Sequence, residues 1–164
     1  MVLGFLQYGC QSGLQVDEEL IVNAITWSPA MAVGITEVDQ AHRDFFVDIE
    51  KISQMPNESL QDGLLQLTAK LERDFRREED LMEACHSEEL KLHREQHAKL
   101  LKALHYLIPD IMQGNYLAGR QAIDVLPNWF FMHVSTADQS MAKSVHDSTL
   151  CDKQQRNKSL GLFY

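Results

Sequence analysis

Apolar residues recur at intervals of three and four along most of the chain from residue 39 onward, which is the spacing of amphipathic helices. This pattern predicts four helices, over about residues 39–54, 59–85, 87–111 and 117–145. Pro56 follows the first of them, and Gly114-Asn115 supplies a turn before the fourth. Four amphipathic helices joined by short connections predict an all-α fold, an antiparallel up-and-down four-helix bundle.

The helix boundaries are predicted from capping residues and prolines. Thr36 with Asp39, and Ser59 with Asp62, have a spacing that resembles the capping box at a helix N-terminus. Pro109 is expected to end or kink the third helix, because its ring lacks the backbone N–H and crowds the preceding turn. These signals place the starts of the first two helices and the end of the third.

The two ends of the chain lack the helical period and are predicted to be separate from the bundle. Residues 1–24 are interpreted as an N-terminal extended arm, and residues 147–164 as a polar C-terminal tail. The bundle, with an extended lead-in at 25–34, is assigned to residues 25–146, and 164 residues suit one such domain. The first ten residues lack the charged region and the long apolar region of a signal peptide.

The net charge of the chain and its cysteine content indicate which partners and which cellular compartment to expect. A formal net charge of −9 argues against binding to nucleic acid or to an anionic membrane surface. No run of residues approaches the roughly 18–20 apolar positions of a membrane span. Cys10, Cys85 and Cys151 are too few and too scattered for a disulfide framework, so a cytoplasmic protein is expected.

Ionisable residues occupy positions where the apolar stripes call for leucine. Asp74 and Glu78 do so in the second predicted helix, His93 and His97 in the third, and His133 in the fourth. Members of each pair are four residues apart, so they share one helix face. Burying an unpaired ion costs several kcal/mol, so these side chains need a common positive partner. A pair of metal ions would supply it, since imidazoles bind Fe or Zn and carboxylates can bridge two ions.

Four segments, in order and over about residues 25–145, resemble those of bacterial hemerythrins. They are Trp27…Val33-Gly34-Ile35…Val38-Asp39-Gln40-Ala41-His42, then Phe75-Arg76-Arg77-Glu78-Glu79-Asp80-Leu81-Met82, then His93-x-x-x-His97, and then Trp129-Phe130-x-x-His133-x-x-x-x-Asp138. The resemblance implies two non-haem iron ions in the core of the bundle. It also implies the ligands: His93, His97 and His133 on one iron, His42 on the other, and Glu78 and Asp138 between them. Because Asp138 follows His133 by five residues, its ligation requires a local distortion of the helix or a long side-chain reach.

Asp74 stands where the family pattern has a further histidine ligand. Asp74 could ligate the second iron directly after a small helix shift, ligate it through a water, or leave that iron weakly bound. An additional carboxylate favours ferric iron and harder ions. We therefore expect faster autoxidation than in a five-histidine relative, or acceptance of manganese or zinc in place of iron.

Apolar residues next to the predicted ligands are expected to form the wall of a small-ligand pocket. They are Trp27, Phe45, Phe75, Leu100, Trp129, Phe130 and Val134. The simpler interpretation of the aromatic residues is ordinary core, and in this fold the core and the pocket coincide. Glu79 and Asp80 are interpreted as solvated surface. His86, His105 and His146 are also interpreted as surface residues, with His86 as a substitute ligand should Asp74 fail.

The resemblance implies a protein that binds dioxygen or a related small ligand as a carrier, store or sensor, and a sensor would act through a separate protein partner. We expect a binding protein rather than an enzyme. Two alternatives remain open. One is a di-iron oxidase, peroxidase or nitric-oxide-handling enzyme, and the other is a degenerate bundle with an incomplete metal site.

Overall fold

The computed structural model describes residues 25–159, with side chains up to residue 149. A short 3-10 turn, η1 (Pro29–Met31), precedes the helices α1 (Thr36–Ser53), α2 (Asn57–Ala84), α3 (Leu90–Met112) and α4 (Tyr116–His133). A π-helical turn, η2 (Val134–Asp138), joins α4 to α5 (Gln139–Ser159) without a break. The all-α prediction is therefore confirmed.

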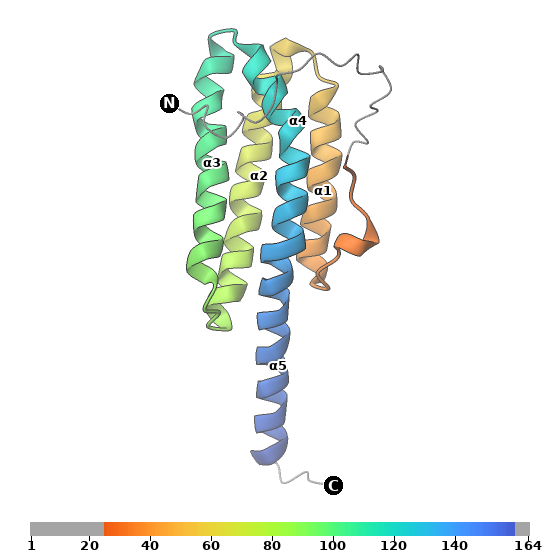
Figure 1. Cartoon of the computed structure of the whole chain (residues 1–164), viewed down its shortest axis with the longest axis vertical. Coiled ribbons are helices and arrows are strands. Elements are labelled where there is room, and N and C mark those ends of the chain that lie inside the picture. Colours follow the sequence, from red (N-terminus) through yellow and green to blue (C-terminus); the bar gives the residue numbers. More distant parts are fainter. Residues whose placement is uncertain (1–24, 160–164) are drawn as a thin grey trace, which may run out of the picture.

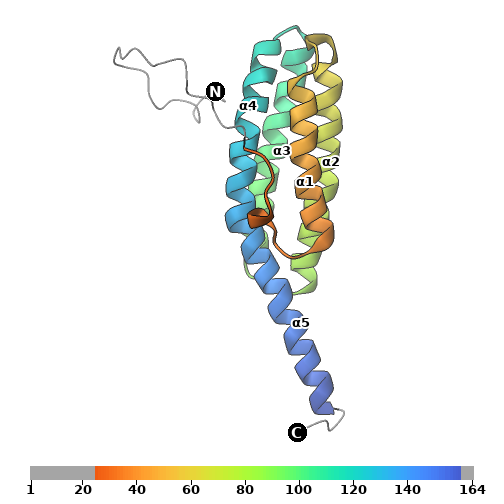
Figure 2. The ribbon, with the colours of Figure 1, turned by 90° about the vertical axis from the view of Figure 1, so that its right-hand side faces the viewer.

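Helices α1 to α4 lie side by side as a four-helix bundle, and the run from α4 through η2 to α5 continues past one end of it (Figure 1). The lead-in before α1 passes along the outside of the bundle, between α1 and the α4–α5 run (Figure 2). The side-chain amide of Gln139 holds it there by donating to the carbonyl oxygen of Ala32, at 3.2 Å. None of the described helices is both long and apolar enough to cross a membrane.

The core consists of the predicted apolar stripes and falls into two clusters along the bundle axis. The larger cluster includes Leu64 and Leu71 of α2, Leu104 of α3 and Ile123 of α4. The smaller one, at the α5 end, is built on three buried side chains: Val38, Met82 and Met141. Burying each such side chain contributes about 1.5–3 kcal/mol. Along α1 and α2, His42 and Glu78 lie between members of the two clusters, so apolar packing holds these helices in place on both sides.

The predicted capping boxes do not form, and this shifts two helix starts. Helix α1 begins at Thr36 rather than near Asp39, and α2 begins at Asn57 rather than Ser59, both without a side-chain cap. The carboxylate of Asp39 instead accepts hydrogen bonds from the backbone N–H groups of Val33 at 2.7 Å and Gly34 at 3.1 Å. Asp39 therefore fastens the lead-in to α1, where Gly34 adopts a positive φ of 83°.

One further predicted helix start and one predicted end differ from the structure. Helix α3 begins at Leu90 rather than near Ser87, and it continues through Pro109 to Met112, one residue beyond its predicted end. The predicted end of the fourth helix at Val145 is wrong, because α5 runs to Ser159. Residues 146–159 contain neither glycine nor proline, so nothing in the local sequence stops the helix. Residues 147–159 of the predicted tail are thus helical, while the predicted arm at 1–24 and residues 160–164 lie outside the described part of the chain.

Candidate metal centre

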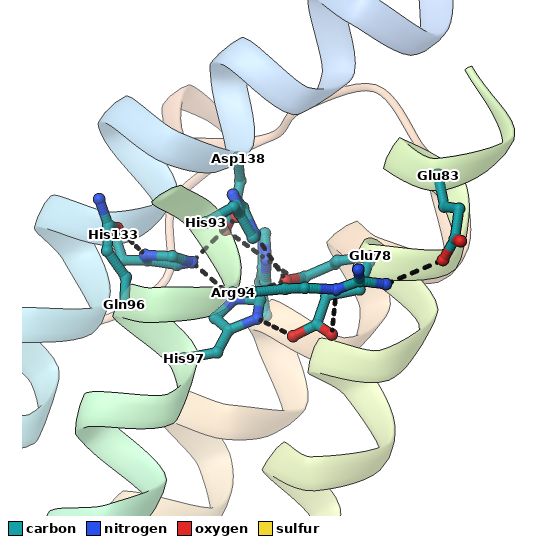
Figure 3. Close-up of polar contacts among 10 residues, drawn as sticks. Glu78, Glu83, His93, Arg94, Gln96, His97, His133 and Asp138 are labelled. Atoms are coloured by element: carbon teal, nitrogen blue, oxygen red, sulfur yellow. Dashed lines mark hydrogen bonds and ion pairs between the residues drawn. The ribbon is translucent and has the colours of Figure 1, made fainter. Parts of the chain in front are cut away.

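Six ionisable side chains from α1, α2, α3, α4 and η2 meet in the middle of the bundle. Figure 3 shows how those of Glu78, His93, His97, His133 and Asp138 lie. Glu78, His93, His97, His133 and Asp138 each offer one ligand atom, and these five atoms lie within 4.8 Å of one another. His42 joins them from α1, with its Nε2 atom 3.2 Å from Asp138 Oδ2. None of the six residues is more than 4% exposed. The structure thus brings together six of the seven predicted ligands.

The two carboxylates lie between His42 on one side and the other three imidazoles on the opposite side. Asp138 Oδ2 faces His42, whereas Asp138 Oδ1 lies 3.2 Å from His133 Nε2 and 3.4 Å from His93 Nε2. Glu78 divides its oxygens in the same way. Its Oε1 lies 3.6 Å from His42 Nε2, and its Oε2 lies 3.2 Å from His97 Nε2 and 3.5 Å from His93 Nε2. Each carboxylate therefore offers one oxygen to each side.

The π-helical turn η2 is what brings Asp138 to the cluster. Five residues of an ordinary α-helix turn the chain to a position roughly 140° away from the first side chain. Across Val134–Asp138 the wider π turn offsets this, and Asp138 Oδ1 comes within 3.2 Å of His133 Nε2. Of the two predicted alternatives, a helix distortion or a long side-chain reach, the structure shows the distortion, and it occurs at the candidate site.

The cluster favours ionised carboxylates even though it excludes water. Burial would raise the pKa of Glu78, but three neighbouring imidazoles hold this pKa well below its usual range. Burial and the charge of Glu78 would raise the pKa of Asp138, but His133 and His42 outweigh them and lower it. Burial would lower the pKa of His42, but the carboxylates of Asp138 and Glu78 raise it to about 9. The buried carboxylates thus attract positive charge to this position.

The outer ring nitrogens indicate that the inner ones are free to bind a cation. His97 donates its Nδ1–H to Glu79 Oε1 at 2.9 Å, and His133 donates its Nδ1–H to Gln96 Oε1 at 2.8 Å. In neutral rings the Nε2 atoms of these two histidines then carry lone pairs, yet they lie only 3.0 Å apart. Two lone pairs at this distance repel unless a proton or a metal cation lies between them.

Unsatisfied buried atoms point to the same conclusion. No hydrogen bond of good geometry satisfies either ring nitrogen of His42 or either carboxylate oxygen of Asp138, although His42 Nε2 and Asp138 Oδ2 lie only 3.2 Å apart. Buried polar atoms of native proteins are almost always paired, so these four atoms call for a ligand. Imidazole nitrogens together with carboxylate oxygens suit first-row transition metals. The residues present therefore fit a metal centre.

A comparison with known proteins agrees with this chemistry. The chain is 27% identical over 117 residues to a protein of Ralstonia nicotianae named Bacteriohemerythrin. The aligned region covers 71% of this chain and 85% of the relative. No family model and no solved structure matches the chain. The likeness supports a hemerythrin-like family. Together with the buried histidine and carboxylate cluster, it also supports a metal site.

Asp74 is not among the side chains that converge. It is half-buried on α2, and its Oδ1 atom lies 3.3 Å from Nη1 of Arg77. Burial raises the pKa of Asp74, although Arg77 acts in the opposite direction. A cavity of about 340 Å³, lined by both residues, by Glu78 and by the start of α1, lies beside the cluster. Direct ligation by Asp74 stays a prediction that needs a rearrangement of this side chain.

The predicted apolar wall packs directly on the imidazole rings. Phe75 stacks on His97 with ring centroids 3.7 Å apart, and Trp129 stacks on His133 at 4.9 Å. Phe130 meets His42 edge-on at 5.4 Å. Of the remaining predicted members, three are buried and one is partly buried: Phe45, Leu100, Val134 and Trp27. These contacts exclude water from the cluster, whereas a role in ligand binding stays a prediction.

Glu79 and Gln96 are the contacts that the sequence analysis missed. The interpretation of Glu79 as solvated surface is wrong, because its side chain is 22% exposed and accepts a hydrogen bond from His97. Glu79 follows the buried Phe75 by four residues, but the buried stripe of α2 continues through Glu78 and Met82, so this spacing alone did not decide its position. Three other histidines and Asp80 are exposed, as predicted: His86, His105 and His146.

Proposed function

We propose that the chain is a non-haem di-iron protein that binds dioxygen or a related small ligand as a carrier, store or sensor. The observation that carries this proposal is the division of carboxylate oxygens within the buried cluster. Asp138 and Glu78 each turn one oxygen to His42 and the other to the remaining imidazoles. Two cations placed on opposite sides of these carboxylates would satisfy all of the facing atoms. The similarity to the Ralstonia bacteriohemerythrin supports iron as the metal.

The ligand assignment follows the two sides of the cluster. Three imidazoles would hold the first ion, which we call the three-histidine position: His93, His97 and His133. His42 would hold the second, which we call the His42 position. Glu78 and Asp138 would contribute one oxygen to each. Manganese or zinc would suit the same donors, since imidazole and carboxylate do not select strongly among these ions.

A pair of ferrous ions, held by these residues, would supply two electrons to dioxygen. The chain's own residues control what reaches the centre. Phe75, Trp129 and Phe130 pack on the imidazoles and keep bulk water away from them. Dioxygen is apolar and small, so it can pass between such side chains more easily than an ion can. We place this activity in the cytoplasm, in keeping with scattered cysteines that include a free, half-buried Cys85.

Asp74 favours a second candidate function, a di-iron oxidase, peroxidase or nitric-oxide-handling enzyme. With Asp74 paired to Arg77, the His42 position has one imidazole and two shared carboxylates. A cavity of about 340 Å³, whose lining includes Glu78, adjoins the cluster on this side. An ion with few protein ligands and an accessible cavity is suited to turnover. We therefore propose faster autoxidation than a fifth histidine would allow.

The test is to load the full chain with ferrous iron without oxygen, count the iron, and record the visible spectrum as air is admitted and removed. A dioxygen-binding protein takes up two ions per chain and gains an absorption band that disappears again under argon. Less than one iron per chain contradicts the proposal. A band that does not reverse favours the enzyme, and Asp74→His should then slow the irreversible step by supplying a further imidazole.

A further inference from the structure

The imidazoles of the cluster differ in what holds their outer nitrogen. His97 Nδ1 donates to a carboxylate, that of Glu79, at 2.9 Å. His133 Nδ1 donates to a neutral amide oxygen, that of Gln96, at 2.8 Å. The Nδ1 atom of His42 is buried and has no partner. The two proposed metal positions therefore have unequal support behind their ligands.

Glu79 is itself fixed from behind by an arginine. Its Oε1 atom accepts from His97, while its Oε2 atom accepts from Arg94 Nε at 3.1 Å. The same guanidinium donates from Nη2 to Glu83 Oε2 at 2.8 Å, so Arg94 spans two successive turns of α2 (Figure 3). Because a planar guanidinium donates in fixed directions, it sets the orientation of the Glu79 carboxylate. Glu79 thus connects a surface ion pair to a buried imidazole.

A carboxylate behind a histidine changes the ring as a metal ligand. It fixes the proton on Nδ1, which leaves the Nε2 lone pair for the metal, and it increases the electron density that Nε2 can donate. It also fixes the plane of the ring, which in His97 is further held by the Phe75 stack at an interplanar angle of 4°. A neutral amide, as at His133, fixes the proton and the ring direction but adds no charge.

We propose that Glu79, held by Arg94, is a positioning residue that makes the three-histidine position the stronger of the two metal positions, so that metal enters there first. Glu79 does not touch the metal in this proposal and acts only through His97. The proposal rests on the metal centre of the proposed function but needs neither iron nor dioxygen. Zinc, which has no redox chemistry, is therefore a sufficient probe.

The chain contains a matched pair that separates this role from an ordinary surface contact. His105 Nε2 lies 2.8 Å from Glu72 Oε1, which is a histidine–glutamate contact between the same two helices. Both side chains are exposed there and lie outside the cluster. Glu72→Gln removes the same charge from α2 as Glu79→Gln without touching a proposed ligand.

The experiment is a titration of the metal-free full chain with zinc alone, for the wild type, Glu79→Gln and Glu72→Gln. We expect Glu79→Gln to weaken binding of the first zinc about 10- to 100-fold, which is the usual effect of removing such a partner, and Glu72→Gln to leave it unchanged. Equal affinities in all three proteins overturn the positioning role alone. Failure of the wild type to take up zinc overturns this inference together with the metal centre.

A second readout reports on the hydrogen bond itself. In the zinc-loaded protein, the Nδ1 proton of His97 should resonate far downfield, because its acceptor is charged, and should move upfield in Glu79→Gln. The resonance of the His133 Nδ1 proton should stay in place. A His97 proton that does not move in the variant contradicts the proposal, since it would mean that the Glu79 carboxylate does not accept this proton in the zinc-loaded protein.

Weaker zinc binding in Glu79→Gln could also follow from a loss of folding, so a variant that should bind zinc more tightly is a useful control. Gln96→Glu adds a carboxylate behind His133 without removing any contact of His97. We expect it to tighten binding of the first zinc and to move the His133 Nδ1 proton downfield. The Glu79 assignment depends on the rule that a carboxylate behind a histidine strengthens it as a metal ligand. Weaker zinc binding in a folded Gln96→Glu protein would overturn this rule.

Discussion

Raising the pH of the metal-free protein should destabilise it, because the charge on His42 is lost. The carboxylates of Asp138 and Glu78 raise the pKa of His42 to about 9, against 6.5 in an unfolded chain. A group whose pKa is higher in the folded state contributes its full stability below the unfolded value. This contribution then falls as the pH approaches the folded value. The relevant window therefore lies between about pH 6.5 and pH 9.

The size of the effect follows from the same two values. The difference between 6.5 and about 9, at roughly 1.4 kcal/mol per pH unit, corresponds to about 3 kcal/mol of unfolding free energy. His42 is 1% exposed, so solvent screens this interaction very little. Such a loss is large beside the roughly 5–15 kcal/mol of total stability that is typical of a domain.

Urea unfolding of the chelator-treated protein at about pH 6 and about pH 9.5 measures the loss. The wild type should lose about 3 kcal/mol more than His42→Gln, which has no proton to release at this position. His105→Gln, which alters an exposed imidazole, should behave as the wild type. Equal losses in the wild type and in His42→Gln would refute the assignment of this proton. In the metal-loaded protein the decline should be absent, because an ion takes the place of the proton.

Three further changes test other parts of the structure. Glu78→Gln removes one of the two shared carboxylates and should lower metal uptake from two ions per chain to one or fewer, as counted by elemental analysis; two ions in the variant would contradict its bridging role. Phe75→Ala should lower the free energy of unfolding by about 3–5 kcal/mol, because a buried ring that stacks on His97 is lost, and urea unfolding measures this. Removing the metal with a chelator should lower the melting temperature, by several degrees for each roughly 1–2 kcal/mol of binding free energy that is lost; an unchanged melting temperature would mean that no metal had been bound to the folded chain.

The fold and most of the cluster could be predicted because the spacing of apolar residues within each helix identifies its buried face. The stripes through Leu64, Leu71 and Leu104 define the buried faces of α2 and α3. Polar residues at stripe positions must then point inward, which is how Glu78 and His97 were found. Asp138 was predicted from the family resemblance, and it required the helix distortion that η2 provides.

The outer contacts could not be predicted, because they depend on how one helix is rotated against its neighbour. Whether Glu79 meets solvent or His97 is decided by the packing of α2 on α3, and periodicity within α2 does not fix that rotation. The helix starts were misplaced for a related reason. Asp39 can cap its own helix or bind a neighbouring loop, and here the N–H groups of Val33 and Gly34 take its carboxylate.

The number of ions that one chain binds at this cluster tests the central claim most directly. Ferrous iron added without oxygen to the metal-free full chain should reach two ions per chain, and the histidine ring resonances of the cluster should be the ones that broaden. Uptake of less than one ion, or broadening at the exposed His86, His105 and His146 instead, would contradict a metal centre built from these six side chains.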